Sequence, residues 1–260
     1  MKRSEPDLVE PDWSTTFTNE MTTSDSHEKR PYRPERLPQA AERSLGEGSL
    51  RAALTVTRRI HEAVAASGKA EPTTADERWE LNQIIRPQEK TALLNWAERT
   101  SHLLDADAFT HEWIAYGEYE GGEHQVYQRG SYFFKRNNLF YHTGWLEYFH
   151  RLVLHNWLFP DTALLFLGLM LVEDEVQPVV KQKALVGIRG AEQKEVEQEM
   201  AQMGFYRRKA DNYYSPMLGI LVEDLHDENV LVSPKGSLLI FDPVIYLTKP
   251  EMGLTMPGAD

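Results

Sequence analysis

The pattern of apolar residues changes near Trp113, and this change most limits the folds open to the chain. Before Trp113 the apolar residues recur at helical intervals. After it come short, aromatic-rich segments separated by glycine and turn residues, with a few helical stretches among them. The first pattern is typical of amphipathic helices and the second of antiparallel strands. The sequence therefore predicts an α+β fold preceded by helices.

The part before this change divides into a tail and a helical extension. Residues 1–46 are rich in proline, serine, threonine and charge, so they cannot bury enough surface to offset the entropy of ordering, and we expect a disordered tail. The alternative is a segment that orders on a partner, with Trp13 and Phe17 as anchors. The helical spacing of apolar residues over 47–109 predicts a helical N-terminal extension. Its helices begin at Ser49, ending near residues 65–68, and then span Ala75–Ile85 and Gln88–Leu104, divided by Pro87.

Residues 110–260 form the remaining predicted domain. Its expected order is three strands, a helix, two strands around a tight turn, a second helix and a C-terminal hairpin. The strands are Tyr116–Glu120, His124–Arg129, Ser131–Lys135, Ala163–Val172, Val176–Val180, Val230–Ser233 and Ser237–Phe241, and the helices are Thr143–Leu158 and Glu192–Met203.

Composition excludes several classes of protein. The net charge of −12 argues against a nucleic-acid partner, which needs a basic face. The absence of cysteine excludes a disulfide scaffold, a thiol nucleophile and cysteine-ligated metal sites, and agrees with a cytoplasmic location. The longest nearly unbroken apolar run, Thr162–Val172, is about half the roughly 20 residues of a membrane helix, so we expect no membrane partner. The spacing of His142, His150 and His155 favours packing over metal binding.

The C-terminal hairpin carries the most informative polar residues. Asn229 precedes its first strand and Asp242 follows its second, so both side chains reach one end of the hairpin. Two such oxygen ligands suit Mg²⁺, which also takes phosphate oxygens and water. Asp224 lies on the preceding loop, where a carboxylate can accept a proton from a hydroxyl. The alternative is an acidic, solvated loop that caps a hairpin.

These residues resemble those of the protein-kinase-like fold. The segment Asp224–Asn229 resembles the kinase catalytic loop, and Ile240-Phe241-Asp242-Pro243 resembles the strand that carries the metal-binding aspartate. From about Gln88 to Leu247 the chain most resembles the small kinase-like domain of polyvalent proteins of phages and conjugative elements. The resemblance implies a reduced core, with a five-stranded antiparallel N-lobe, one helix, and a minimal, truncated C-lobe containing the catalytic hairpin.

The resemblance also implies an ATP site upstream. Gly121 and Gly122 would admit phosphate oxygens to the backbone, Lys135 would reach the α- and β-phosphates, and Glu147 would hold the lysine ammonium. Other interpretations stay open: the glycines suit a flexible turn, Lys135 suits an exposed strand, and Glu147 can pair with Arg151 at i,i+4.

The expected function is an ATP- and Mg²⁺-dependent phosphotransferase that acts on a hydroxyl of an unknown protein or small molecule. Asp224 would be the base, with Asn229 and Asp242 as metal ligands. The chain departs from kinases at Val222-Glu223, where the family has His-Arg, and at Pro243-Val244, where it has Phe-Gly. The truncated C-lobe and the altered Asp-Pro motif favour a second hypothesis, a catalytically inactive pseudokinase that acts as a nucleotide-binding or protein-interaction module.

Overall fold

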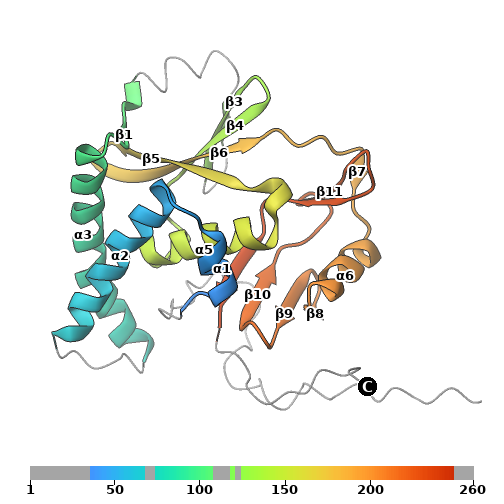
Figure 1. Ribbon diagram of the computed structural model, residues 1–260, viewed down its shortest axis with the longest axis horizontal. Helices are drawn as coiled ribbons and strands as arrows, with labels where there is room; N and C mark the ends of the chain where they lie inside the picture. Colours follow the sequence, from blue (N-terminus) through green and yellow to red (C-terminus); the bar gives the residue numbers. More distant parts are fainter. Residues whose placement is uncertain (1–35, 68–73, 108–117, 121–123, 249–260) are drawn as a thin grey trace, which may run out of the picture. The chain divides into compact units, whose positions relative to one another are not determined.

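The computed structural model describes residues 36–67, 74–107, 118–120 and 124–248. These residues form a mixed α+β fold with three sheets and a small number of helices (Figure 1). The predicted fold class is therefore confirmed at this level. Within the described parts of the chain, no helix combines the length and apolar character that crossing a membrane requires.

Three helices come first. They are α1 (Gln39–Ser44), α2 (Ser49–Ala66) and α3 (Ala75–Arg99). The predicted start of a helix at Ser49 is confirmed, but α1 lies within the segment predicted to be a tail. Leu37 and Ala41 are buried, and α1 packs on a later helix, α5, so tertiary contacts stabilise a segment whose composition favours disorder.

Pro87 does not divide α3, and the prediction of two separate helices is wrong. A proline inside a helix leaves the carbonyl four residues earlier without its amide partner. Pro87 and Gln83 are both exposed, so water can solvate that carbonyl. The helix then ends at Arg99, and Leu103–Leu104, predicted as its last turn, forms strand β1 instead.

The largest sheet has six strands in the order β1-β5-β6-β4-β3-β2. Five of them are antiparallel to their neighbours, as predicted, and β1 adds a short parallel edge along β5. Glu173 and Asp174, both with positive φ, form the two-residue turn between β5 and β6, as in a type I′ hairpin. The remaining strands are β2 (Glu118–Glu120), β3 (His124–Arg129), β4 (Tyr132–Asn137), β5 (Leu164–Val172) and β6 (Glu175–Lys183).

A close backbone contact fixes the edge of this sheet. Gly168 lies at a β-bulge in β5 with φ +154°, and Leu169 N donates to His102 O at 2.8 Å. A Cβ atom on Gly168 would lie 2.1 Å from His102 O. Only glycine therefore allows the segment after α3 to approach β5 this closely.

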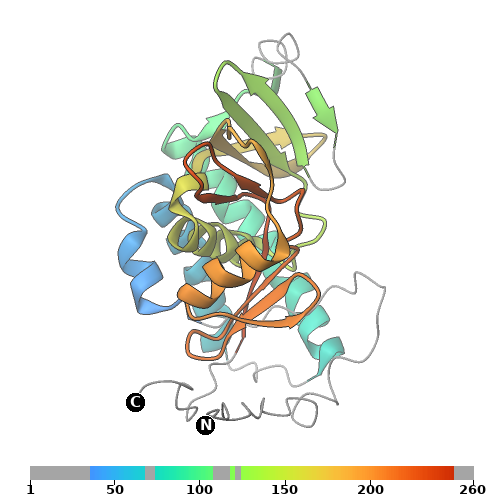
Figure 2. The same cartoon turned by 90° about the vertical axis from the view of Figure 1, so that its right-hand side faces the viewer.

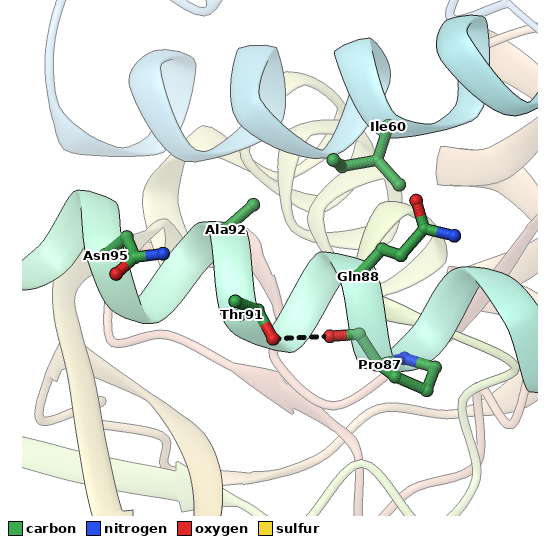
Figure 3. Close-up of a pocket in the computed structure, with 6 residues that line it drawn as sticks. All are labelled: Ile60, Pro87, Gln88, Thr91, Ala92 and Asn95. Atoms are coloured by element: carbon green, nitrogen blue, oxygen red, sulfur yellow. Dashed lines mark hydrogen bonds between the residues drawn. The ribbon is translucent and has the colours of Figure 1, made fainter.

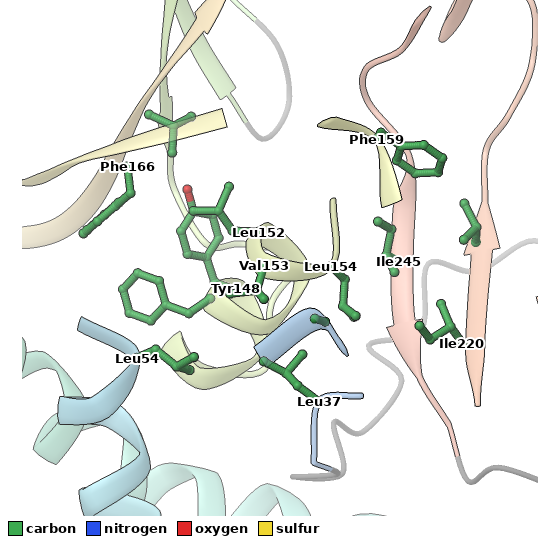
Figure 4. Packing of buried hydrophobic residues seen from close by; sticks show 14 of the residues in the cluster. Leu37, Leu54, Tyr148, Leu152, Val153, Leu154, Phe159, Phe166, Ile220 and Ile245 are labelled. Atoms are coloured by element: carbon green, nitrogen blue, oxygen red, sulfur yellow. The ribbon is translucent and has the colours of Figure 1, made fainter. Parts of the chain in front are cut away.

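Helix α5 (Trp145–Leu158) lies at the centre of the core, and ten of its fourteen residues are buried. It contacts α1, α2, α3, β5 and β13. Figure 4 shows its side chains between Leu54 of α2 and Phe166 of β5, with Ile220 and Ile245 beyond its C-terminal half. One large cluster built around α5 thus joins the N-terminal helices, the large sheet and the C-terminal strands, and Tyr127 and Phe134 of the large sheet form a second, small cluster.

The first turn of α5 is capped by a carboxylate from α3. Glu89 is fully buried, and its Oε2 and Oε1 accept hydrogen bonds from Trp145 N and Leu146 N, each at 3.1 Å. His61 Nε2 of α2 lies 2.9 Å from Glu89 Oε1. A carboxylate at this position satisfies two unpaired amides and complements the positive end of the helix dipole. Glu89 therefore links α2 and α3 to α5.

The C-terminal part contains two smaller sheets. One has the order β13-β10-β9-β8 and the other β12-β11-β7 (Figure 1). Helix α6 (Gln193–Gln202), which confirms the predicted helix, packs beside β8 (Figure 2). The strands are β7 (Arg189–Gly190), β8 (Tyr206–Lys209), β9 (Asn212–Ser215), β10 (Ile220–Glu223), β11 (Val230–Val232), β12 (Leu238–Ile240) and β13 (Val244–Leu247), and a 3-10 turn, η2 (Pro160–Thr162), follows α5.

Replacing the buried cap tests its contribution to stability. Glu89→Ala leaves two buried amides and His61 without their acceptor, so we expect the free energy of unfolding to fall by about 3 kcal/mol. Glu89→Gln keeps one acceptor oxygen and should lose less. Urea unfolding followed by circular dichroism measures both. Glu98→Ala, at an exposed position of the same helix, is the control; a loss no larger than that of Glu98→Ala would contradict the cap.

Two buried histidines predict a loss of stability at mildly acidic pH. Burial lowers the pKa of His150 to about 3, helped by Arg58 and His61, and burial lowers the pKa of His155 to about 4. Both stay neutral in the folded state, whereas an unfolded histidine binds a proton below pH 6.5. Stability should therefore fall as pH drops from 7 to 5, by about 2 kcal/mol for each histidine. Unfolding of His155→Gln should show a correspondingly weaker pH dependence; an equal dependence would contradict the assignment.

Candidate active site

A buried lysine and a half-exposed aspartate meet between the large sheet and the C-terminal hairpin. Lys135 lies on β4, where it pairs with Val126 of β3 and Val180 of β6, and it is only 7% exposed. Its Nζ donates a hydrogen bond to Asp242 Oδ1 at 3.0 Å, and the Asp242 side chain is 44% exposed. A buried ammonium requires such a partner, because desolvation penalises an unpaired charge.

Strand pairing brings the three predicted hairpin residues to one place. Glu223 at the end of β10 pairs with Val244 at the start of β13, so Asp224 and Asp242 lie at the same end of that strand pair. In the β11–β12 hairpin, Phe241 N donates to Asn229 O at 3.2 Å, so Asn229 lies opposite Phe241, the residue before Asp242.

The Asp224 loop is held by its own side chains. Asp224 has φ +70°, a left-handed conformation that aspartate tolerates better than most residues. Asn229 Nδ2 donates to both Asp224 O and Asp224 Oδ2 at 3.0 Å. His226 Nε2 lies 3.4 Å from Asp224 Oδ1, and its Nδ1 accepts from Glu228 N at 3.2 Å. The contacts of His226 were not anticipated from the sequence.

Glu147 differs from the prediction that it holds the Lys135 ammonium. Its Oε2 accepts from Thr143 N at 2.8 Å and from Thr143 Oγ1 at 2.6 Å, and its Oε1 pairs with Arg151. The i,i+4 pair named as the alternative is the one that forms. Lys135 instead pairs with Asp242.

The predicted phosphate-binding glycines, Gly121 and Gly122, lie outside the described residues. Their flanking strands, β2 and β3, pair with each other next to β4, the strand that carries Lys135.

An apolar connection joins the large sheet to the hairpin sheet. Strand β6 ends at Lys183, and the chain then exposes Val186 and Ile188, at 67% and 65%, before it enters β7. Gly187 packs closely against Leu231 of the β11–β12 hairpin, because a Cβ atom at position 187 would lie 2.7 Å from Leu231 Cβ. Val180 faces Lys135, so this connection begins about 10 Å along β6 from the lysine.

Two further observations concern metal binding and pockets in the described part of the chain. There, no three or more His, Asp or Glu side chains gather into a cluster that could hold a metal ion through protein ligands alone. A pocket of about 440 Å³ lies between α2 and α3, and none of the predicted site residues line it (Figure 3). It is lined by Ile60, Pro87, Gln88, Thr91, Ala92 and Asn95.

One of three comparisons with known proteins found a match. Neither a search of curated proteins nor one of solved structures found a match. A family model described as "Serine/Threonine/Tyrosine Kinase found in polyvalent proteins" matches residues 86–249, more than half of the chain and all of the C-terminal strands. The match confirms the predicted resemblance, which covered about Gln88 to Leu247. The chain therefore belongs to the family of kinases found in polyvalent proteins.

Proposed function

We propose that this chain is a Mg²⁺- and ATP-dependent phosphotransferase that transfers the γ-phosphoryl group to a hydroxyl. The observation that carries the proposal is the ion pair between Lys135 and Asp242, because it unites β4 with the hairpin that holds Asn229. A buried cation beside two oxygen ligands is what phosphoryl transfer requires: charge neutralisation and positioning.

The donor set at the hairpin fits Mg²⁺. Asp242 offers a half-exposed carboxylate and Asn229 an amide oxygen, and Mg²⁺ characteristically takes one or two such protein oxygens together with phosphate oxygens and water. Asn229 Nδ2 faces Asp224, so its amide oxygen is not used in those two hydrogen bonds. When bound, the cation would bridge phosphate oxygens and neutralise charge that develops on them.

Lys135 would then exchange its partner. Its ammonium is attached to a rigid central strand and contacts Asp242, whose exposed side leaves room for phosphate oxygens. With nucleotide bound, Lys135 would donate to the α- and β-phosphates. The exposed apolar side chains of Val186 and Ile188, in the connection that follows β6, would be available to contact a nucleobase.

Asp224 would act as the base. Its carboxylate is 53% exposed, so a hydroxyl can approach it. Asn229 and His226 fix its orientation through the contacts at Oδ2 and Oδ1. Held in this way, the carboxylate would accept the proton of the hydroxyl as the phosphoryl group is transferred, and orientation rather than basicity would supply most of the acceleration.

A pseudokinase that binds nucleotide or a protein partner without turnover is the second candidate. The Asp242-Pro243-Val244 sequence, which differs from Asp-Phe-Gly, favours it. Glu147 also pairs with Arg151 instead of Lys135, so the lysine lacks the partner that active kinases give it. Turnover distinguishes the two candidates, because only the phosphotransferase transfers phosphate, whereas either one can bind nucleotide.

Nucleotide binding should depend on Asp242. ATP at 100 times its dissociation constant should raise the free energy of unfolding by about 2.7 kcal/mol when Mg²⁺ is present. Asp242→Asn removes the charged metal ligand, so the Mg²⁺-dependent part of this gain should disappear. Thermal unfolding with ATP, with MgCl₂ or EDTA, measures it, and Asp174→Asn in the exposed β5–β6 turn is the control. No shift of the wild type at millimolar Mg-ATP would contradict the proposed site.

Turnover should depend on Asp224. Asp224→Asn keeps the side-chain shape but removes the base, so we expect phosphoryl transfer to fall 10²- to 10⁴-fold while ATP affinity changes less than about threefold. Transfer of labelled γ-phosphate to the protein itself, and to water, provides the assay. Binding of Mg-ATP by the wild type with no transfer above that of Asp224→Asn would favour the pseudokinase.

A further inference from the structure

Thr162 occupies a junction between the two halves of the candidate active site. It ends the short turn η2 between α5 and β5, and it is only 2% exposed. Its hydroxyl donates a hydrogen bond to Ile240 O, two residues before Asp242. This threonine belongs to none of the sequence motifs that identify the site.

The Ile240 carbonyl depends on that hydroxyl because of the hairpin register. Asn229 O accepts from Phe241 N, so the neighbouring pair, Val230 and Ile240, is a non-hydrogen-bonded pair of the ladder. The Ile240 carbonyl therefore points away from β11. Strand β12 is the edge of its sheet, so among the described strands none beyond it pairs with this carbonyl, and Thr162 supplies the donor.

The carbonyl of Thr162 is held from two further elements. Gln182 Nε2 of β6 donates to Thr162 O at 2.7 Å, and His155 Nε2 of α5 lies 3.0 Å from the same oxygen. Gln182 is 3% exposed and lies two residues from Val180, the strand partner of Lys135. Thr162 thus joins the strand next to Lys135 to the strand that leads to Asp242.

His155 is suited to a fixed donor role. Burial lowers its pKa to about 4, so near neutral pH it is uncharged and carries one N–H. With that hydrogen on Nε2, His155 donates to Thr162 O. The threonine hydroxyl lies 3.2 Å from Phe159 O and makes its shorter contact with Ile240 O.

We propose that Thr162 is a positioning residue, which fixes the Ile240–Asp242 segment relative to Lys135 and thereby sets the Asp242 carboxylate for the Mg²⁺ of a bound nucleotide. The inference rests on the proposed function, because it concerns the affinity for Mg-ATP. It adds a residue that touches neither nucleotide nor metal and acts through the backbone of β12.

The test compares ATP affinity with Mg²⁺ and with EDTA, measured by calorimetry on the full chain. The ratio of the two affinities isolates the contribution of the metal, which a general loss of stability does not change. Thr162→Val removes the hydroxyl at nearly constant shape, and Thr162→Ser restores it. Thr57→Val is the matched control: Thr57 is fully buried and its hydroxyl donates to Leu54 O at 2.9 Å within α2.

We expect Thr162→Val to lower the Mg²⁺-dependent ratio about tenfold, as the loss of one well-placed hydrogen bond would, while Thr162→Ser and Thr57→Val keep the wild-type ratio. An unchanged ratio in folded Thr162→Val would overturn the inference and leave the proposed function intact. If Thr162→Val does not fold, Gln182→Met serves instead, with a decrease of about threefold expected and no decrease overturning the inference. A wild type that binds no ATP in either condition would contradict the proposed function and this inference with it.

Discussion

Burial of helix α5 is the constraint on which the rest of the structure depends. A helix surrounded by protein cannot leave its first amides to water, so the chain must supply an acceptor inside the core. Glu89 does so from α3, and the buried carboxylate is in turn accompanied by His61 from α2. The N-terminal helices are therefore part of the same folding unit as the kinase-like sheet. Their contacts with α5 explain why α1 is helical although its composition favours disorder.

The two charged residues of the ion pair, Lys135 and Asp242, are buried to different extents. Lys135 lies on β4 between β3 and β6 and is only 7% exposed, whereas the Asp242 side chain is 44% exposed. The ammonium of the ion pair is therefore buried and the carboxylate is accessible. A buried ammonium whose partner can be exchanged is suited to bind phosphate oxygens, because folding has already removed it from water. Under the proposed function, the same asymmetry would let Asp242 leave the ion pair and become a metal ligand.

Local patterns predicted the hairpins and missed interactions between distant segments. The convergence of Asn229 and Asp242 followed from a strand, a tight turn and a strand, which sequence spacing defines well. The prediction that Pro87 divides a helix was wrong because the effect of a proline depends on whether its helix face meets water. Strands β8, β9 and β10 were not predicted, because they are too short to show a clear alternation of apolar and polar residues. The role of Lys135 came from family resemblance. Nothing in the residues around Thr162 indicates its bond to a strand 78 positions away.

The pair at the centre of the site joins residues 107 positions apart. Closing so long a loop costs entropy before the contact forms, so we expect Lys135 and Asp242 to come together after the strands between them have paired. Because β12 and β13 come last among the described strands, a chain still emerging from the ribosome holds the buried lysine's strand long before its partner exists. The ion pair can therefore form only after the strands from β4 to β12 and the residue Asp242 that follows them have been synthesised.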